Sequence, residues 1–256
     1  MNIIADTHTH TSASTHAYSS LSEVVHAAAL KGLYAVAITD HGEAMPGSPQ
    51  PWYFHNMHVI PRILEGVIVL RGQECNVLDY EGHIDLRQDD EPVMDWIVAS
   101  MHTPTMPKGS HTVEDITRAW LAVARDPRVH VIGHSGSDQY VFDYERVIPE
   151  FGKNGKLVEL NESSFINRPS FIPNCAGILS LCKKYGVPVI LNTDSHFATL
   201  VGDFSHSLAL LEQMNFPEEL VVNSSIWRFN EYLRAHTHVL EEPIFNEFAG
   251  GKNGSH

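Results

Sequence analysis

The sequence has few cysteines and no long apolar run. Its three cysteines, Cys75, Cys175 and Cys182, form no C-x-x-C pair and leave one over, which excludes a disulfide framework and fits a reducing compartment. No stretch approaches the roughly 18 consecutive apolar residues of a transmembrane helix, and no basic segment followed by an apolar run opens the chain. These absences predict a cytoplasmic protein that does not bind membranes.

Basic residues are also scarce. Lysine and arginine number 17 against 31 aspartates and glutamates, which gives a formal net charge of −14. Proteins that hold nucleic acid through a broad surface need an excess of positive charge, so the expected partner is a small molecule and not nucleic acid. The length of 256 residues, with 43% hydrophobic and 19% charged residues, predicts a single large α/β domain over residues 1–256. The oligomeric state is left open.

Histidine, by contrast, is abundant. The 17 histidines are roughly three times the number that average composition gives, and such an excess indicates metal ligation. The first motif is Asp6-Thr7-His8-Thr9-His10, which follows the start of an apolar strand at residues 2–5. Side chains two apart in a strand point to the same face, so His8 and His10 form a ready ligand pair that Asp6 is placed to brace. The alternative is a histidine-rich turn that alternates by chance.

Apolar strands and amphipathic helices alternate along the chain. After the first strand, further strands are expected at residues 34–39, 67–71, 96–100, 129–132, 156–160 and 189–191. Helices are expected at residues 21–31, 55–64, 113–125, 174–185, 205–214 and 226–235, with a loop at 43–52 and a hairpin-like insertion turning at 79–82. Seven alternating strands predict a parallel sheet, either closed into a barrel or open and doubly wound.

The positions of the polar residues decide between these two sheets. Residues of ligand type follow six of the strands: His8, His10, His41, Glu74, His102, His134, Asp194 and His196. In a closed barrel the carboxyl ends of all strands meet at one mouth, whereas an open sheet would spread these residues along an edge. The pattern therefore predicts a distorted (β/α)7 TIM-like barrel, an α/β fold, with one shared site.

These motifs resemble those of a known family. Asp6-Thr7-His8-Thr9-His10, Thr39-Asp40-His41, Arg71-Gly72-Gln73-Glu74, Met101-His102, Gly133-His134 and Asn192-Thr193-Asp194-Ser195-His196 are similar to the motifs of the PHP (polymerase and histidinol phosphatase) domain. The segments 13–19 and 161–165 resemble its small bacterial single-domain phosphatases, which have a trinuclear metal centre. The resemblance runs from Asp6 to about Asn230.

The resemblance implies three divalent metal ions. One would be held by His8, His10, Glu74 and Asp194, a second by Glu74, His102 and His134, and the third by His16, His41 and His196. Spacing alone supports the ligand set but not this division. Imidazole with a few carboxylates suits zinc best, with manganese or iron as alternatives.

A cluster of adjacent divalent metals is typical of enzymes that hydrolyse small phosphate monoesters, and we expect a hydroxide bridging two metals to be the nucleophile. Glu74, Asp194 and His196 are the expected catalytic residues, with Asp194 or a histidine at the mouth protonating the leaving group. Four residues are candidates for substrate binding: Arg168, Arg71, Asn161 and Ser164. Alternatively, Arg168 is an ordinary solvated arginine, Arg71 pairs with an acid, and the two polar residues cap the next element.

Other function classes stay open. A histidinol-phosphatase-type enzyme of the same family is one. An amidohydrolase-like enzyme acting on C–N or C–O bonds is another, although such barrels usually carry a carboxylated lysine where this chain has Glu74. A metal-storage protein would have little need of ligands from so many strands. A nuclease is disfavoured by the net charge of −14.

Overall fold

The computed structural model describes residues 1–245, so residues 246–256 of the expected domain lie outside the described part. The strands are β1 (Ala5–Thr9), β2 (Ala35–Ile38), β3 (Ile63–Leu64), β4 (Val67–Asn76), β5 (Trp96–Ser100), β6 (Val131–Ile132), β7 (Leu157–Asn161) and β8 (Val189–Asn192). The α-helices are α1 (Leu21–Leu30), α2 (Pro51–His55), α3 (Val113–Arg125), α4 (Tyr144–Lys153), α5 (Ser163–Asn167), α6 (Ile172–Tyr185), α7 (Ser205–Gln213) and α8 (Ile226–His236).

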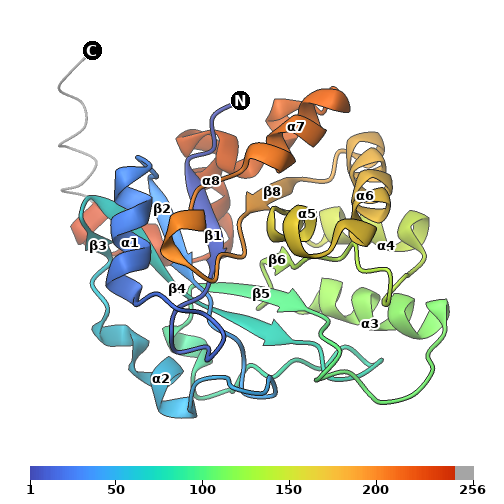
Figure 1. Ribbon diagram of the computed structural model, residues 1–256, viewed down its shortest axis with the longest axis horizontal. Helices are drawn as coiled ribbons and strands as arrows, with labels where there is room; N and C mark the ends of the chain where they lie inside the picture. Colours follow the sequence, from blue (N-terminus) through green and yellow to red (C-terminus); the bar gives the residue numbers. More distant parts are fainter. Residues whose placement is uncertain (246–256) are drawn as a thin grey trace.

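Seven parallel strands form the sheet in chain order, β1-β2-β4-β5-β6-β7-β8, with helices between them (Figure 1). The short β3 pairs antiparallel with β4 outside this order. The long β4 pairs with β2 through its first half and with β5 through its second, Gly72–Asn76, so the sheet is staggered as a closing barrel requires.

The barrel closes between β8 and β1 at the carboxyl end. The Asp194 amide donates to the His8 carbonyl at 2.9 Å, and the His10 amide donates to the Ser195 carbonyl at 2.9 Å. Further down, the Asn223 side chain lies between the two strands and donates to the carbonyls of Ala5 at 2.8 Å and Leu191 at 2.7 Å. The predicted TIM-like barrel is therefore confirmed, with a side chain replacing part of the last strand pair.

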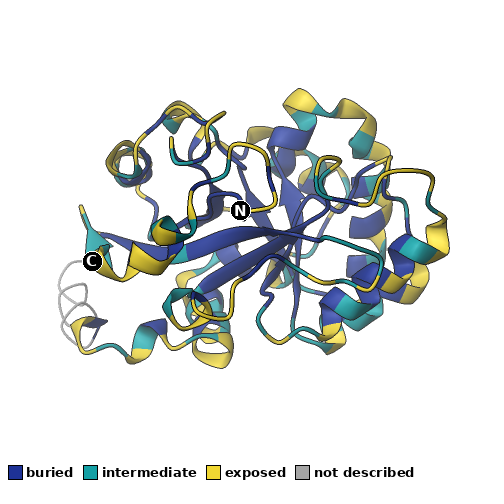
Figure 2. Ribbon diagram, turned by 90° about the horizontal axis from the view of Figure 1, so that it is seen from below, coloured by how far each residue is buried: buried dark blue, intermediate teal, exposed yellow. Residues whose placement is uncertain are grey.

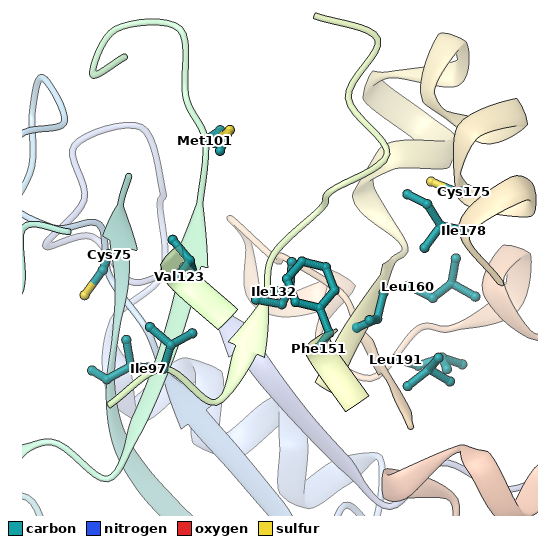
Figure 3. Close-up of a cluster of buried hydrophobic side chains, with 14 of the residues drawn as sticks. Cys75, Ile97, Met101, Val123, Ile132, Phe151, Leu160, Cys175, Ile178 and Leu191 are labelled. Carbon is teal, nitrogen blue, oxygen red and sulfur yellow. The ribbon is translucent and has the colours of Figure 1, made fainter. Parts of the chain in front are cut away.

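Two hydrophobic cores stabilise this arrangement. The inner core fills the barrel and includes Ile68, Leu70 and Trp96, and α8 covers it from below with the buried Phe229 and Leu233. The outer core lies between the sheet and the surrounding helices. Figure 3 draws part of it, with Phe151 of α4 beside Ile132 of β6 and Leu160 of β7. Apart from β3 and Arg71 of β4, which are half-buried, the strands are buried, while the helices expose their outer faces (Figure 2).

Local sequence explains where the helices begin and end. Ser20 and Thr112 accept hydrogen bonds from the third residues of α1 and α3, and those acidic residues, Glu23 and Asp115, bond back to the caps. Gly186 ends α6 in the left-handed region at φ 67°, a conformation that glycine adopts without strain.

Some expected elements differ from the structure. The α-helix expected at residues 55–64 is wrong: α2 ends at His55, a short 3-10 helix spans Asn56–Val59, and Ile63–Leu64 forms β3. Pro61 interrupts the helical pattern, and Glu65 and Gly66, at φ 50° and 78°, form the tight turn from β3 into β4. The sequence pattern also missed α4 and α5. In residues 1–245, no helix is long and apolar enough to cross a membrane.

Candidate metal centre

All nine expected ligands meet at the carboxyl ends of the strands. His8 lies on β1 and Glu74 within β4, while His10 and His16 lie on the loop after β1. The other expected ligands lie on the loops that follow their strands: His41, His102, His134, Asp194 and His196. Glu74 differs slightly from expectation because it lies within β4 and not past its end. Six strands, with the loops that follow them, thus deliver one cluster of imidazoles and carboxylates.

Glu74 lies at the centre of this cluster and is buried. Its Oε1 is 3.3 Å from His8 Nε2, 3.3 Å from His102 Nε2 and 3.0 Å from His134 Nε2. Its Oε2 is 2.6 Å from His41 Nδ1. A carboxylate whose two oxygens face different imidazole groups has the placement that a bridging ligand needs.

Asp194 occupies one side of the cluster. Its Oδ1 lies 3.2 Å from His10 Nε2 and 3.7 Å from His8 Nε2, while its Oδ2 accepts from Arg168 Nη2 at 2.9 Å. The backbone of Asp194 has φ 53°, and that of His134 has φ 22°, in a region that most L-residues avoid. Such strain concentrates where side chains must be aimed at a functional site.

The remaining histidines form a neighbouring group. His16 Nε2 is 3.1 Å from His41 Nε2, and the rings of His16 and His196 lie 4.8 Å apart. Three sets of ligand atoms fall within 4.8 Å of one another: His8, His10 and Asp194; His41, Glu74 and His102; and His10, His41 and His196. The first agrees with the expected division among metals, whereas the other two combine residues expected on different metals. The division therefore stays a prediction.

Several buried atoms of the cluster lack a hydrogen-bond partner within the described residues: His8 Nε2, His10 Nδ1, His10 Nε2, His41 Nδ1 and Glu74 Oε2. Leaving a buried polar atom unsatisfied costs about 1–3 kcal/mol, so an inward-facing set of such atoms is unusual without a ligand. Imidazole nitrogens and carboxylate oxygens are the donors that zinc, manganese and iron accept. The residues present therefore fit a metal cluster.

The electrostatics keep both carboxylates ionised. Burial opposes the ionisation of Glu74, but His102, His8 and His41 outweigh it and hold its pKa well below the usual range. Burial likewise opposes the ionisation of Asp194, and His8, His10, His196 and Arg168 hold its pKa well below normal. In contrast, burial and the neighbouring His41 lower the pKa of His10 well below its ordinary value. At His8, burial is outweighed by Glu159, Glu74 and Asp194, which raise the pKa of the ring well above its ordinary value. Since metals bind neutral imidazoles and charged carboxylates, metal binding would release a proton from His8 but not from His10.

Two residues that the sequence pattern missed orient the ligands from behind. Glu159 on β7 accepts from His8 Nδ1 at 2.7 Å and from the His134 amide at 2.7 Å. Asn76, at the end of β4, accepts from His102 Nδ1 at 2.8 Å through its side-chain oxygen. Because each acceptor fixes the proton on Nδ1, the Nε2 lone pairs of His8 and His102 face the cluster.

The two aspartates next to the histidine motifs hold the backbone. Asp40 accepts from Thr11 Oγ1 at 2.7 Å, Ser14 Oγ at 2.7 Å and the Tyr53 hydroxyl at 2.6 Å, which fixes the loop that carries His16. Asp6 does not brace the histidines as expected. It accepts from the Thr193 amide at 3.0 Å and from its hydroxyl at 2.5 Å, and burial raises its pKa to about 6. The register of β1 against β2 shifts between Asp6 and Thr9.

The four expected substrate-binding residues fall in three places. Arg168 is half-buried beside Asp194 at the mouth. Arg71 lies away from the cluster, since its guanidinium donates to the carbonyls of His58 at 3.0 Å and Ile60 at 2.6 Å. Asn161 donates to Glu159 at 3.0 Å and to Asp194 Oδ2 at 3.3 Å, and it accepts from the Ser164 amide at 3.0 Å. Both polar side chains are buried, and Asn161 contacts an expected metal ligand.

Two cavities open beside the cluster. One of about 410 Å³ is lined by His102, His134 and Arg168 together with residues of the 137–140 loop. The other, of about 170 Å³, is lined by Asp194 and His196 and by residues of α5 and α7. Arg168 is the basic side chain of the first cavity, which makes that side of the cluster the more favourable for an anionic group.

Comparisons with known proteins agree with the family resemblance and the fold. A model of the PHP domain matches residues 6–163. A probable phosphatase of Caldicellulosiruptor saccharolyticus is 42% identical over 236 residues, which is 92% of this chain and 98% of that protein. A probable phosphatase of Acetivibrio thermocellus is 41% identical over 235 residues, covering 91% of this chain and 96% of that one.

A solved structure has the same fold. The histidinol phosphate phosphatase of Lactococcus lactis subsp. lactis, crystallised with zinc, L-histidinol and phosphate, superposes with a TM-score of 0.58 at 18% identity. The alignment covers 85% of this chain and 95% of that one. With the matched family model and relatives above 40% identity over nine-tenths of its length, the chain belongs to the PHP-domain family.

Proposed function

We propose that this protein is a metal-dependent phosphatase that hydrolyses small phosphate monoesters. The observation that carries the proposal is the buried cluster itself, in which imidazole and carboxylate atoms without hydrogen-bond partners face one another at the mouth of the barrel. The relatives described as probable phosphatases support the same reaction class. We further propose three divalent metal ions, zinc first, and an enzyme that works on a small molecule in the cytoplasm.

When bound, divalent metals supply an activated water at neutral pH and neutralise the charge on the phosphoryl oxygens. The chain's own residues hold and aim this chemistry. Glu74 and Asp194 provide fixed negative charge, and His196 completes the ligand shell on the side of the smaller cavity. Arg168 donates one N–H to Asp194, and the other N–H groups of its planar guanidinium suit a phosphate oxygen in the larger cavity. Arg71 takes no part in this arrangement.

Histidinol phosphate is a candidate substrate, because the Lactococcus lactis protein was crystallised with L-histidinol and phosphate. Amide or lactone hydrolysis is the competing reaction class. Glu74 occupies the centre of this cluster, where amidohydrolase-like barrels usually place a modified lysine, and this favours phosphate esters.

A substrate panel tests the proposal. Purified protein loaded with zinc, manganese or iron is assayed against phosphate monoesters, histidinol phosphate among them, and against amides and lactones. We expect phosphate release that a chelator abolishes and added metal restores. Turnover of amides or lactones by fully metallated protein, with no phosphate ester hydrolysed, would favour the amidohydrolase reading instead.

A further inference from the structure

The smaller cavity beside the metal centre contains a histidine outside the ligand set. Its lining includes two expected ligands, Asp194 and His196, and also Glu162, Asp203 and His206. His206 is the second residue of α7, and its side chain is 57% exposed, so a molecule in the cavity can reach it. A side chain that shares a cavity with metal ligands is placed to contact a substrate bound there.

Glu162 fixes the orientation of this histidine. The carboxylate is buried, and its Oε1 lies 2.7 Å from His206 Nδ1 and accepts from the His206 amide at 2.8 Å. Its Oε2 accepts from the Ser207 amide at 2.8 Å, so Glu162 also caps the first turn of α7. Phe165 stacks against the imidazole with ring centroids 5.8 Å apart. Because an ionised carboxylate only accepts, Nδ1 carries a proton and Nε2 is the nitrogen left to exchange one.

Hydrolysis of an alkyl phosphate is helped by a side chain that donates a proton to the leaving group. As water attacks phosphorus, the P–O bond to the alcohol breaks and its electron pair stays on the leaving oxygen, which needs a proton to depart as a neutral alcohol. Asp194 is a poor source because its Oδ2 accepts hydrogen bonds from Arg168 at 2.9 Å and Asn161 at 3.3 Å, while its Oδ1 faces His10 Nε2 at 3.2 Å inside the cluster. His196 contributes to the expected ligand shell. His206 is the remaining histidine of the cavity.

We propose that His206, oriented by Glu162, is the general acid that protonates the leaving alcohol in the smaller cavity. The Nε2 proton passes to the leaving oxygen, and the imidazole regains a proton from the one that the attacking water releases. The net reaction is phosphate monoester plus water to alcohol plus inorganic phosphate. This inference rests on the proposed phosphatase function. It further places the alcohol part of the substrate in the smaller cavity, beside Asp194 and His196.

Leaving groups of different basicity test the assignment. Propyl phosphate needs a proton on its departing oxygen, whereas p-nitrophenyl phosphate releases a stable phenolate without one. In His206→Asn the amide nitrogen still donates to Glu162, but the Nε2 proton is lost. We expect kcat for propyl phosphate to fall by about 100-fold or more and kcat for p-nitrophenyl phosphate by less than about 5-fold, at unchanged metal content. His206→Gln should behave in the same way.

The chain offers a matched control. His83 Nδ1 lies 2.7 Å from Asp79 in an exposed turn outside both cavities, and His83→Asn should leave both rates unchanged. If the His206 variants lose both substrates equally, or lose neither, His206 is not the acid although the phosphatase function stands. Wild-type protein that hydrolyses neither ester would overturn the proposed function and this inference together.

Discussion

Glu159 accepts hydrogen bonds from four groups that surround the metal centre. Besides His8 Nδ1 and the His134 amide, the Asn192 side chain donates to it at 2.9 Å and the Asn161 side chain at 3.0 Å. All four partners are donors, so this position requires a group that only accepts. Burial opposes ionisation of Glu159, but His8 and His134 outweigh it and lower its pKa.

Replacing this carboxylate by an amide should therefore weaken metal binding. In Glu159→Gln one amide N–H must face a donor, and if it faces His8 the ring has to place its proton on Nε2, the atom directed at Glu74. We expect metal affinity to fall by about 10–100-fold, as is usual when the acceptor behind a ligating histidine is lost. Competition with a chelating dye measures it.

Glu65→Gln is the control for this substitution, because Glu65 accepts from His26 Nδ1 at 2.8 Å on the exposed surface. It should bind metal like the unchanged protein. Equal affinity of Glu159→Gln and Glu65→Gln would show that Glu159 does not orient His8.

Among individual residues, the sequence predicted the ligands of the cluster but not the residues that orient them. The ligands could be found because most of them lie at or just after the carboxyl end of an apolar strand, where a barrel gathers side chains. Glu159 lies inside such a strand, and its only signal is alternation, since Leu157, Glu159 and Asn161 share one face of β7. His206 gave no signal either, because its role depends on a cavity formed with α5, far from it in sequence.

Among the secondary-structure elements, helix α2 holds the loop that carries His16, one of the expected metal ligands. Its Tyr53 donates a 2.6 Å hydrogen bond to Asp40, and the same carboxylate accepts from the amides of Thr11 at 2.9 Å and Ser14 at 3.3 Å. Ser14 Oγ in turn accepts from the His41 amide at 3.2 Å. The excursion between β2 and β3 therefore packs against the loop that presents His16.

Tyr53→Phe should loosen this loop without altering any ligand. Loss of a hydrogen bond to a charged acceptor costs about 1.5–3 kcal/mol of unfolding free energy. We also expect faster hydrogen exchange at the Thr11 and Ser14 amides. Tyr18→Phe, at a residue that is 74% exposed, should change neither quantity. Unchanged exchange at both amides in Tyr53→Phe would mean that α2 does not hold the loop.

The elements themselves were predicted unevenly. The strands were found because fully buried parallel strands are continuous apolar runs. The segment from 55 to 64 was misread because its apolar spacing imitates a helix, although Pro61 and the Glu65-Gly66 turn mark a hairpin. Helix α4 was missed since Pro149 lies inside it, and only its Asp143 cap signals a start.

Helix α8 is connected to the strands at the bottom of the barrel, opposite the candidate metal centre. His130 precedes β6 and stacks on Trp96 with ring centroids 5.2 Å apart. Its Nδ1 accepts from the Ile97 amide at 3.0 Å, and its Nε2 lies 3.2 Å from the carbonyl of His236 at the end of α8. The neutral imidazole thus ties the covering helix to the strands, a link that sequence spacing across more than a hundred residues cannot reveal.

This link predicts a loss of stability in acid. Burial, with smaller contributions from Lys156 and His236, lowers the pKa of His130 to about 4, below the roughly 6.5 of an unfolded histidine. The folded state therefore binds fewer protons than the unfolded state, and stability present above pH 6.5 declines as the pH falls toward 4. His130→Gln can keep both hydrogen bonds but cannot titrate. Urea unfolding at pH 7 and pH 5 should show the wild type losing about 2 kcal/mol more than His130→Gln. Because both proteins have the same metal ligands, the acid sensitivity of the metal centre cancels in this difference. Parallel losses in the two proteins would mean that His130 does not carry the acid sensitivity of the barrel.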